Sequence, residues 1–378
     1  MRSLGLYIHV PFCKRKCNYC DFYSLSCPQK DNLVDYVSII CSHIEKEAHL
    51  YEDLVFDTVF LGGGTPSLLD ETEITRLFDA IRANLNVSEN AEISIEANPG
   101  TLTREKLLAY KQCGINRISM GLQSSCDSEL SMLGRIHTLE EFEKSYRLVK
   151  ETGFDNVSVD IMYALPSQNL DSLMRTVDYV ANLNPTHVSA YCLKIEDGTP
   201  FSKMKLDLPS EDEQYEMCLS LCERLAEFGY EQYEISNFAK NGARCVHNLK
   251  YWLSKEYVGF GPSAHSFFDG VRYFYDSDLG AYVKAIKDGN LPKKQVEDLP
   301  ALTDEERMDE YVMLALRLSD GIDTADFASR FGINFEDAYD IQKYVDSGHI
   351  TLDGKHYGFT SKGFFVSNYI LSNMLKTL

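Results

Sequence analysis

The sequence predicts an α/β protein with a parallel sheet, followed by a smaller α+β region. Between residues 6 and 228, short β-branched or aromatic runs alternate with longer stretches of helical period. This alternation is typical of strand–helix units whose strands lie parallel, in a sheet that is either open or closed into a barrel. After about Tyr230 the pattern changes to aromatic, glycine-containing segments. We therefore expect one domain over residues 1–230 and a second over residues 231–378.

The predicted strands share β-branched and aromatic residues over short runs. They are Leu6–Val10, Asp57–Leu61, Glu92–Ala97, Arg117–Leu122, Val157–Met162 and His187–Leu193. The predicted helices share apolar residues spaced three and four apart beside a charged face. They are Asp31–Leu50, Glu71–Leu85, Thr103–Gln112, Leu139–Thr152, Leu170–Leu183 and Glu211–Phe228. The sequence thus predicts six strand–helix units.

The second region begins with the aromatic segments Val258–Phe268 and Val271–Tyr275. An acidic helix is expected over Asp304–Leu318, followed by shorter elements and a final amphipathic helix. A helix pair with a hairpin, similar to a winged helix, is one interpretation of this end. Such a shape hints at DNA, but its acidic surroundings favour a structural or partner-docking role.

Composition argues against a nucleic-acid partner and for the cytoplasm. The formal charge of −20, from 57 acidic and 37 basic residues, repels a phosphate backbone on average. No apolar leader segment follows Met1 and no run of eighteen apolar residues occurs, so we expect no transmembrane segment, while a peripheral membrane association stays open. Eleven cysteines in a reducing compartment indicate metal binding or catalysis rather than disulfides.

The strongest motif is Cys13-Lys-Arg-Lys-Cys17-Asn-Tyr-Cys20, which lies in the loop after the first strand. Soft thiolate ligands match iron, and a compact loop brings three of them onto one face of a 4Fe-4S cluster. A fourth ligand is missing, which leaves one iron open to an exogenous donor. Cys27 is an alternative fourth ligand, and a zinc site or incidental core thiols are the other readings. Zinc sites usually pair two close cysteine units, and no second unit is present.

These residues, together with Tyr7-Ile-His-Val-Pro-Phe-Cys13, make the chain resemble the radical S-adenosylmethionine (SAM) superfamily over nearly its whole length. The resemblance implies a partial (β/α)6 barrel with a 4Fe-4S cluster on Cys13, Cys17 and Cys20. The open iron of that cluster would bind the amino and carboxylate groups of SAM. The similarity is closest to the coproporphyrinogen dehydrogenase-like group, which includes heme chaperones.

The resemblance also implies a set of SAM-binding residues, most of which follow or end predicted strands. Ligands bind at the carboxyl ends of parallel strands in such folds. The expected SAM residues are Tyr7, Tyr19, Gly63, Gly64, Thr65, Glu96, Gln123, Arg135, Asp160, Cys192 and His265. Each one taken singly is equally well explained as a surface or core residue. No catalytic residue is assigned.

The motif His247-Asn-Leu-Lys-Tyr-Trp252 holds the only tryptophan. A histidine among aromatic rings suits axial ligation of heme iron, with the rings packed on the macrocycle. The alternative is a histidine and a tryptophan that close a core between domains. The motif matches the HNxxYW pattern of the heme-chaperone members, so we take His247, Tyr251 and Trp252 as a hypothetical heme site.

Two functions compete at this stage. Coproporphyrinogen dehydrogenases carry an extension before the first strand and a fourth cysteine two residues after the third ligand, where this chain has Phe22. The preferred hypothesis is therefore a heme chaperone that passes heme to an acceptor protein, with a respiratory hemoprotein as one candidate. The alternative is a radical SAM oxidoreductase acting on a porphyrinogen. The oligomeric state stays open, with a homodimer as one option.

Overall fold

The computed structural model describes residues 2–26, 29–296 and 303–376. The α/β fold predicted from the sequence is confirmed, and each of the six predicted strands is found. They are β1 (Ser3–Val10), β4 (Val55–Gly63), β5 (Val87–Ala97), β6 (Arg117–Gln123), β7 (Asn156–Tyr163) and β8 (His187–Cys192). Neighbours in this order pair in parallel, as expected for strands joined by crossover helices.

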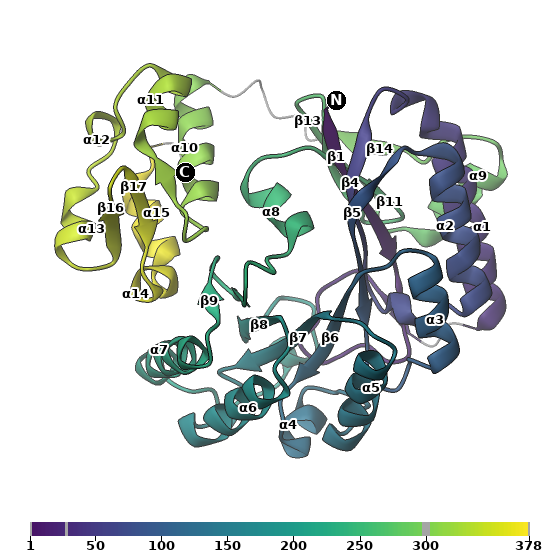
Figure 1. Ribbon diagram of the computed structural model, residues 1–378, viewed down its shortest axis with the longest axis horizontal. Helices are drawn as coiled ribbons and strands as arrows, with labels where there is room; N and C mark the ends of the chain where they lie inside the picture. Colours follow the sequence, from purple (N-terminus) through teal and green to yellow (C-terminus); the bar gives the residue numbers. More distant parts are fainter. Residues whose placement is uncertain (1, 27–28, 297–302, 377–378) are drawn as a thin grey trace.

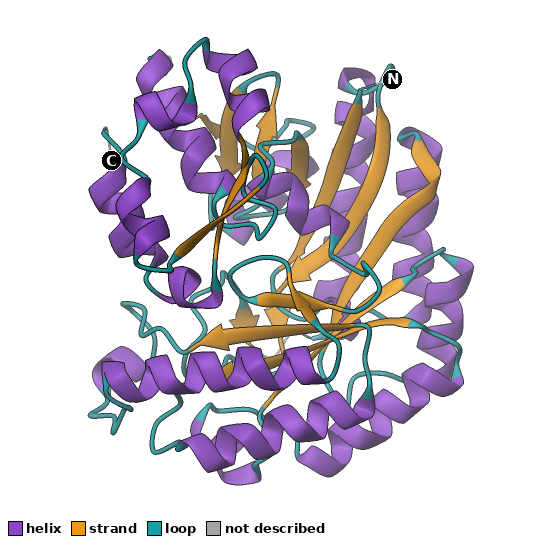
Figure 2. Ribbon diagram, turned by 60° about the vertical axis from the view of Figure 1, so that its left-hand side comes forward, coloured by secondary structure: helices purple, strands orange, loops and turns teal. Residues whose placement is uncertain are grey.

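The crossover helices cover the outer face of the curved sheet (Figures 1 and 2). They are α1 (Lys30–Glu47), α2 (Glu71–Asn84), α3 (Arg104–Gln112), α5 (Leu139–Glu151), α6 (Leu170–Leu183) and α7 (Glu211–Glu227). Several begin at a residue whose side chain accepts hydrogen bonds from the first turn, as Asp70, Thr138, Asn169 and Ser210 do. Such capping boxes satisfy backbone N–H groups that the helix itself leaves unpaired.

Short elements complete the connections around these units. They are β2 (Phe12–Cys13), β3 (Leu25–Ser26), the helix α4 (Asp127–Met132), and the 3-10 turns η1 (Ala48–Leu50), η2 (Pro66–Leu68) and η3 (Phe201–Lys203). β2 and β3 pair in parallel beside the cysteine loop.

The two faces of the sheet differ in chemistry. Outward-facing residues such as Leu6, Ile8 and Ile95 are buried in the main hydrophobic core beneath the helices. The inward-facing positions of β5 and β7 are polar instead, with Glu92 and Glu96 on β5 and Asp160 on β7. A polar interior does not seal itself by side-chain packing, so the concave side of the sheet is free to hold ligands or another element.

The sheet continues beyond the six barrel strands at both ends, giving twelve strands among the described residues. β11 (Tyr257–Phe260) pairs in parallel with β1, so that Tyr7 lies opposite Gly259. The further strands are β12 (His265–Phe268), β13 (Val271–Tyr275) and β14 (Lys294–Val296) on that side, and β10 (Asn237–Ala239) and β9 (Glu231–Gln232) beyond β8. The helix α9 (Leu279–Lys287) packs beside α1.

The predicted boundary at residue 230 stays a prediction, but β9 to β14 are hydrogen-bonded into the main sheet. A large separate hydrophobic core lies later in the chain, among residues 312–375. Its elements are α10 (Asp304–Ala315), β15 (Ile322–Asp323), α11 (Thr324–Phe331), α12 (Phe335–Ala338), α13 (Gln342–Asp346), β16 (Ile350–Asp353), β17 (His356–Phe359), α14 (Ser361–Phe365) and α15 (Ser367–Met374). We call residues 303–376 the C-terminal unit.

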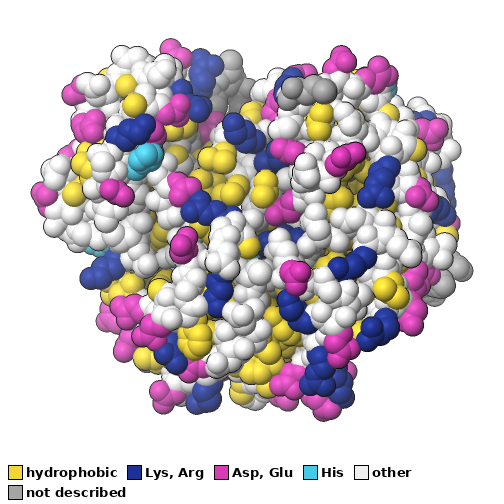
Figure 3. All heavy atoms as spheres, in the orientation of Figure 1, with side chains coloured by type: hydrophobic (Ala, Val, Ile, Leu, Met, Phe, Trp, Pro, Cys, Tyr) yellow, Lys and Arg dark blue, Asp and Glu magenta, His cyan; other side chains and the backbone are white. Residues whose placement is uncertain are grey.

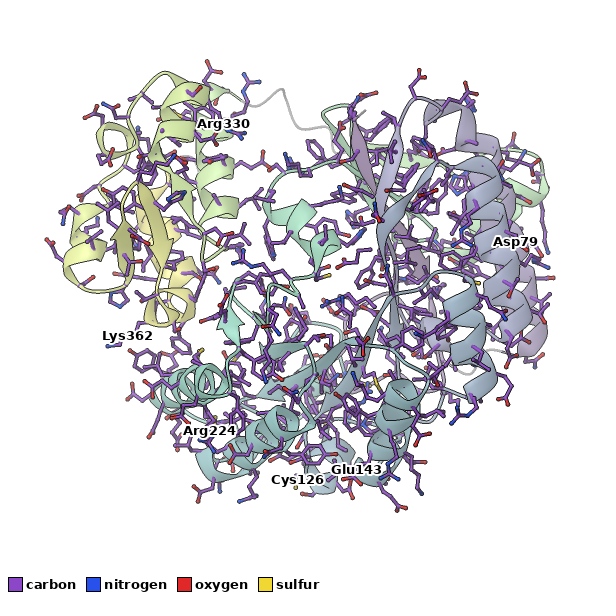
Figure 4. The ribbon with its side chains drawn as sticks, viewed as in Figure 1. Asp79, Cys126, Glu143, Arg224, Arg330 and Lys362 are labelled. Atoms are coloured by element: carbon purple, nitrogen blue, oxygen red, sulfur yellow. The ribbon has the colours of Figure 1, made fainter. Side chains whose placement is uncertain are left out.

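The C-terminal unit touches the barrel through α14, which packs on α7, and through α10, which packs on α8 (Val246–Trp252). Figure 4 labels Lys362 on α14 and Arg224 on α7, the two helices of the first contact. α8 itself lies on the concave side of the sheet, facing β4 (Figure 1). Within the described residues, no helix combines the length and apolarity that a membrane crossing needs.

Candidate functional site

A cleft of about 480 Å³ opens at the carboxyl ends of the barrel strands. Most of the site residues predicted from the sequence line it: Cys13, Cys17, Tyr19, Cys20, Gly63, Gly64, Thr65, Glu96, Gln123, Arg135 and Asp160. These residues come from the loop after β1, from the carboxyl halves or ends of β4, β5, β6 and β7, and, for Arg135, from the loop between α4 and α5. The fold therefore gathers at one edge of the sheet residues that are up to 147 positions apart, from Cys13 to Asp160.

The cysteine loop is held in place by the chain that follows α4. Asn18 donates its backbone N–H to Leu133 O at 2.9 Å and its side-chain amide to Met132 O at 2.9 Å. The thiols of Cys13 and Cys17 each accept a weak hydrogen bond, from Thr65 Oγ1 at 3.5 Å and from Arg135 at 3.7 Å. Hydrogen-bond donors aimed at sulfur favour the thiolate, which is the form that binds metal.

The three cysteines fit an iron–sulfur cluster by donor type. The three thiols are free, partly exposed and open to the same cleft. Burial raises the pKa of Cys20 to about 11, so a metal has to displace a proton there. Cys27, the alternative fourth ligand, lies outside the described residues. In the described part of the chain, no three His, Cys, Asp or Glu side chains are grouped closely enough for a single metal ion.

The glycines at the end of β4 and directly after it are required by contacts within the protein. Gly63 has φ of +103°, and a Cβ there would lie 2.5 Å from the ring of His9. A Cβ on Gly64 would lie 2.6 to 2.7 Å from backbone atoms of Val10 and Phe12. The two glycines therefore let the loop pack against the strand that leads into the cysteine loop.

Two carboxyl groups that line the cleft lie close enough to influence each other's charge. Burial and the nearby charge of Asp160 raise the pKa of Glu96 to about 8, although Gly63 donates its N–H to Glu96 Oε2 at 3.1 Å. Burial also raises the pKa of Asp160, against the hydrogen bonds of Ser119 and other serine hydroxyls. A cationic ligand placed between these groups would stabilise both carboxylates.

Arg135 joins the cysteine loop to the strand ends. Its guanidinium donates to Asn98 Oδ1 and to Gly121 O, both at 2.7 Å, besides Cys17. The buried Nε of Arg135 has no hydrogen-bond partner among the described residues. An unpaired buried donor lining a cleft is a common sign of a missing ligand. Gln123 lies beside it at the end of β6 with φ of 74°, a strained value for this residue type.

Three predicted SAM residues lie outside the lining of the cleft. Tyr7 is on the inner face of β1, where its hydroxyl is hydrogen-bonded to His9 Nδ1 at 3.0 Å. Cys192 turns its thiol toward α7, with Gln214 Oε1 at 3.8 Å. His265, exposed on β12, stacks on Phe274 with ring centroids 5.0 Å apart.

The His247 motif lies in α8, and within it His247 and Lys250 are buried. His247 is fully buried, with Nδ1 hydrogen-bonded to Thr58 Oγ1 at 2.8 Å and Nε2 to the Tyr251 hydroxyl at 2.8 Å. Its ring stacks on Phe60 at 5.2 Å, and burial lowers its pKa to about 3. Both ring nitrogens are therefore engaged, and the histidine is neutral near pH 7.

The rest of α8 is anchored in the same way. Glu92 accepts the backbone N–H groups of Val246 at 3.0 Å and His247 at 2.9 Å, which caps the start of the helix. Lys250 forms an ion pair with Asp57 at 2.6 Å. At the other end the guanidinium of Arg317 lies 5.4 Å from the centre of the Trp252 ring, which links the motif to the C-terminal unit.

Comparison with known proteins decides the family. A model of the radical SAM superfamily matches residues 7–180, and a model of the HemN C-terminal domain matches residues 302–366. The heme chaperone HemW of Buchnera aphidicola (Schizaphis graminum) is 33% identical, over 98% of this chain and 98% of its own length. HemW of Bacillus subtilis is 32% identical, over 98% of this chain and 99% of its own length. The chain belongs to the HemW family of radical SAM proteins.

The fold of this HemW family member is shared with a solved structure. Coproporphyrinogen III oxidase (HemN) from Escherichia coli superimposes with a TM-score of 0.86 at 24% identity, covering 100% of this chain and 91% of that chain. At this level of identity the likeness shows the architecture and not the activity.

Sequence reasoning missed several residues of the cleft in this HemW-family chain. They are Asn98, Ser119, Met162, Tyr191, Lys194 and Glu196, with Phe22 at the rim. The alternation of a strand provides a signal for one of them, because His187, Ser189 and Tyr191 share one face of β8 and Cys192 lies on the other. Asn98 had a weaker signal, its place directly after the carboxyl end of β5, whereas Ser119 is the third residue of β6 and had no such signal.

Proposed function

We propose that this chain is a heme chaperone, which binds heme and transfers it to an acceptor protein. The observation that carries the proposal is similarity over 98% of the chain to relatives that are named heme chaperones. We expect the protein to act in the cytoplasm, with a respiratory hemoprotein as one candidate acceptor. Acidic and basic side chains are mixed over the face that Figure 3 shows, whereas a nucleic-acid backbone is bound by a continuous basic surface.

We propose further that Cys13, Cys17 and Cys20 hold a 4Fe-4S cluster with exchangeable SAM. The cluster supplies an iron with a free coordination position when it is bound. The residues of the protein itself orient the ligand and balance the charge of the cluster. Arg135 balances the negative cluster from beside Cys17, and its unpaired Nε provides a further donor toward the cleft.

The cleft suits a small cationic ligand such as SAM. Its volume of about 480 Å³ is in the usual range of a small-molecule site. Glu96 and Asp160 offer carboxylate oxygens for an ammonium or for hydroxyl groups, and Tyr19 provides an aromatic ring on the same wall. Tyr7, Cys192 and His265 complete the proposed SAM set, although they lie outside the lining of the cleft.

The heme proposal places His247, Tyr251 and Trp252 at the heme site, and the geometry sets a condition on it. His247 has no exposed surface, and each ring nitrogen already has a hydroxyl partner. Ligation of iron therefore requires α8 to move out of the barrel and to give up at least one of these hydrogen bonds. The free energy of that opening subtracts from the heme affinity.

An anaerobic experiment tests the proposed function. The cluster is reconstituted, SAM and a reductant are added, and heme and coproporphyrinogen III are offered separately. A heme Soret band with transfer to an apo-hemoprotein, and no turnover of coproporphyrinogen III, is the expected result. Decarboxylation of coproporphyrinogen III would instead establish the oxidoreductase alternative. Gel filtration of the same samples tests for a homodimer.

A further inference from the structure

A chain of buried hydrogen bonds runs from the cleft into the interior of the barrel. It starts at Asp160, whose Oδ1 accepts the hydroxyl of Ser158 at 3.3 Å on the same face of β7. Ser158 Oγ is hydrogen-bonded to His187 Nδ1 at 2.8 Å on the neighbouring strand β8. Ser158 and His187 lie directly opposite each other in the parallel register, so the sheet itself fixes this contact.

The same chain continues to the start of α8. His187 Nε2 is hydrogen-bonded to the hydroxyl of Tyr233 at 2.9 Å, and this hydroxyl accepts the backbone N–H of Cys245 at 3.1 Å. Cys245 is the residue that precedes α8. Ser158, His187, Tyr233 and Cys245 are each at most 2% exposed. An uninterrupted series of contacts thus connects a carboxylate of the cleft with the first backbone donor of the His247 helix.

Each hydrogen bond in this series has one defined donor and one defined acceptor. Burial lowers the pKa of His187 well below its usual value, so the ring is neutral and has one donor and one acceptor nitrogen. Tyr233 accepts from Cys245, and the arrangement that pairs every atom has its proton donated to His187 Nε2. His187 Nδ1–H then donates to Ser158, and Ser158 donates to Asp160. Each of these side chains therefore donates its proton in the direction of the Asp160 carboxylate.

A ligand at Asp160 competes with Ser158 for the carboxylate. Ser119 already donates to both oxygens of Asp160, at 3.0 and 3.2 Å, and Ser158 takes a further position on Oδ1. A carboxylate has about four acceptor positions. Ligand hydroxyls that bind there compete for those positions, and Ser189 Oγ, 3.4 Å from Ser158 Oγ, offers the displaced hydroxyl another acceptor.

We propose that Ser158, His187 and Tyr233 are positioning residues that couple occupancy of the cleft at Asp160 to the hold on α8. This inference rests on the proposed function, since it concerns how SAM influences the heme site of the same chain. When a ligand hydroxyl displaces Ser158 from Asp160, the hydrogen bonds that join Ser158, His187 and Tyr233 are no longer polarised by the carboxylate. The hydrogen bond between Tyr233 and the Cys245 N–H is then weaker. Release of α8 then costs less free energy, so SAM increases the affinity for heme.

The test measures heme affinity with and without SAM, using the full-length, cluster-reconstituted protein without reductant. For the wild type, SAM is expected to lower the heme Kd by at least about fivefold. We call the hydrogen bonds from Asp160 through Ser158, His187 and Tyr233 to Cys245 the relay. Tyr233→Phe removes only the hydroxyl that links His187 to Cys245. Ser158→Ala removes the hydroxyl that links His187 to Asp160. Each is expected to bring the ratio of the two Kd values to about 1, while iron content is kept and SAM still binds at saturating concentration.

Tyr230→Phe is the matched control. Tyr230 is also buried, and its hydroxyl donates to Pro185 O at 2.8 Å, outside the relay. This variant is expected to keep the wild-type ratio. The relay is overturned if both relay variants keep the wild-type ratio, if the control loses it as well, or if SAM leaves the heme Kd of the wild type unchanged. Failure of the wild type to bind heme at all would instead reject the proposed function.

Discussion

Replacement of Thr58 by Val tests how the His247 helix is held. Thr58 is fully buried, and its hydroxyl is the partner of His247 Nδ1 at 2.8 Å. Valine has nearly the shape of threonine but no hydroxyl, so the ring nitrogen loses its partner without a large cavity. An unpaired buried polar atom costs about 1 to 3 kcal/mol. We expect the free energy of unfolding to fall by this amount.

The same substitution has the opposite effect on heme if His247 binds the iron. In the wild type, ligation through Nδ1 requires the bond to Thr58 to break, whereas in Thr58→Val that bond is already absent. The cost moves from the heme-binding step to the folding step. Because 1.4 kcal/mol is a factor of ten in an equilibrium constant, we expect heme to bind at least about fivefold more tightly.

Urea denaturation of the apo-protein and a Soret titration with heme provide the two measurements. Thr176→Val is the control, because Thr176 is also fully buried and its hydroxyl is hydrogen-bonded to Ser125, far along the chain from α8. It should lower stability and leave heme affinity unchanged. If Thr58→Val lowers stability but leaves heme affinity unchanged or weaker, heme iron does not compete with Thr58 for His247. The motif then has a structural role only.

Three further predictions concern the cluster and the buried acids. Serine at Cys13, Cys17 and Cys20 should abolish bound iron and labile sulfide after anaerobic reconstitution, whereas Cys126→Ser, at the start of α4, should keep both. SAM affinity of the wild type should rise with pH up to about 8, because Glu96 holds a proton below its raised pKa; calorimetry should find a flatter profile for Glu96→Gln. Burial raises the pKa of Glu234 to about 7, so the folded state binds this proton more tightly than the unfolded chain. The free energy of unfolding should therefore fall as the pH rises from about 4.5 to 7. In denaturation experiments over this pH range, Glu234→Gln should lack that decrease.

The His247 motif has two roles to reconcile. In the structure it is a helix packed on the concave side of the sheet, anchored by Glu92 at its start, by Thr58 on β4 and by Arg317 from the C-terminal unit. Heme binding by the same residues requires this helix to move away from the sheet. A helix of seven residues held by a few polar contacts is a suitable element for such a change, since short helices gain little stability from their own hydrogen bonds.

The sequence by itself determined the features that depend on short stretches of chain. The six strand–helix units follow from local periodicity, and the cysteine loop follows from the spacing of Cys13, Cys17 and Cys20 within eight residues. The position of Glu96 and Asp160 in the cleft also follows, because parallel strands bring their carboxyl ends to one edge.

Only the tertiary structure decided which side chains share a space. The pairing of β11 with β1 brings together residues some 250 positions apart, such as Tyr7 and Gly259, and no local pattern encodes that choice. The helix α8 precedes β11 in the chain and packs on β4, where His247 is buried against Thr58. Burial and hydrogen-bond partners are properties of the assembled chain, because they depend on which distant segments exclude water from the same atoms.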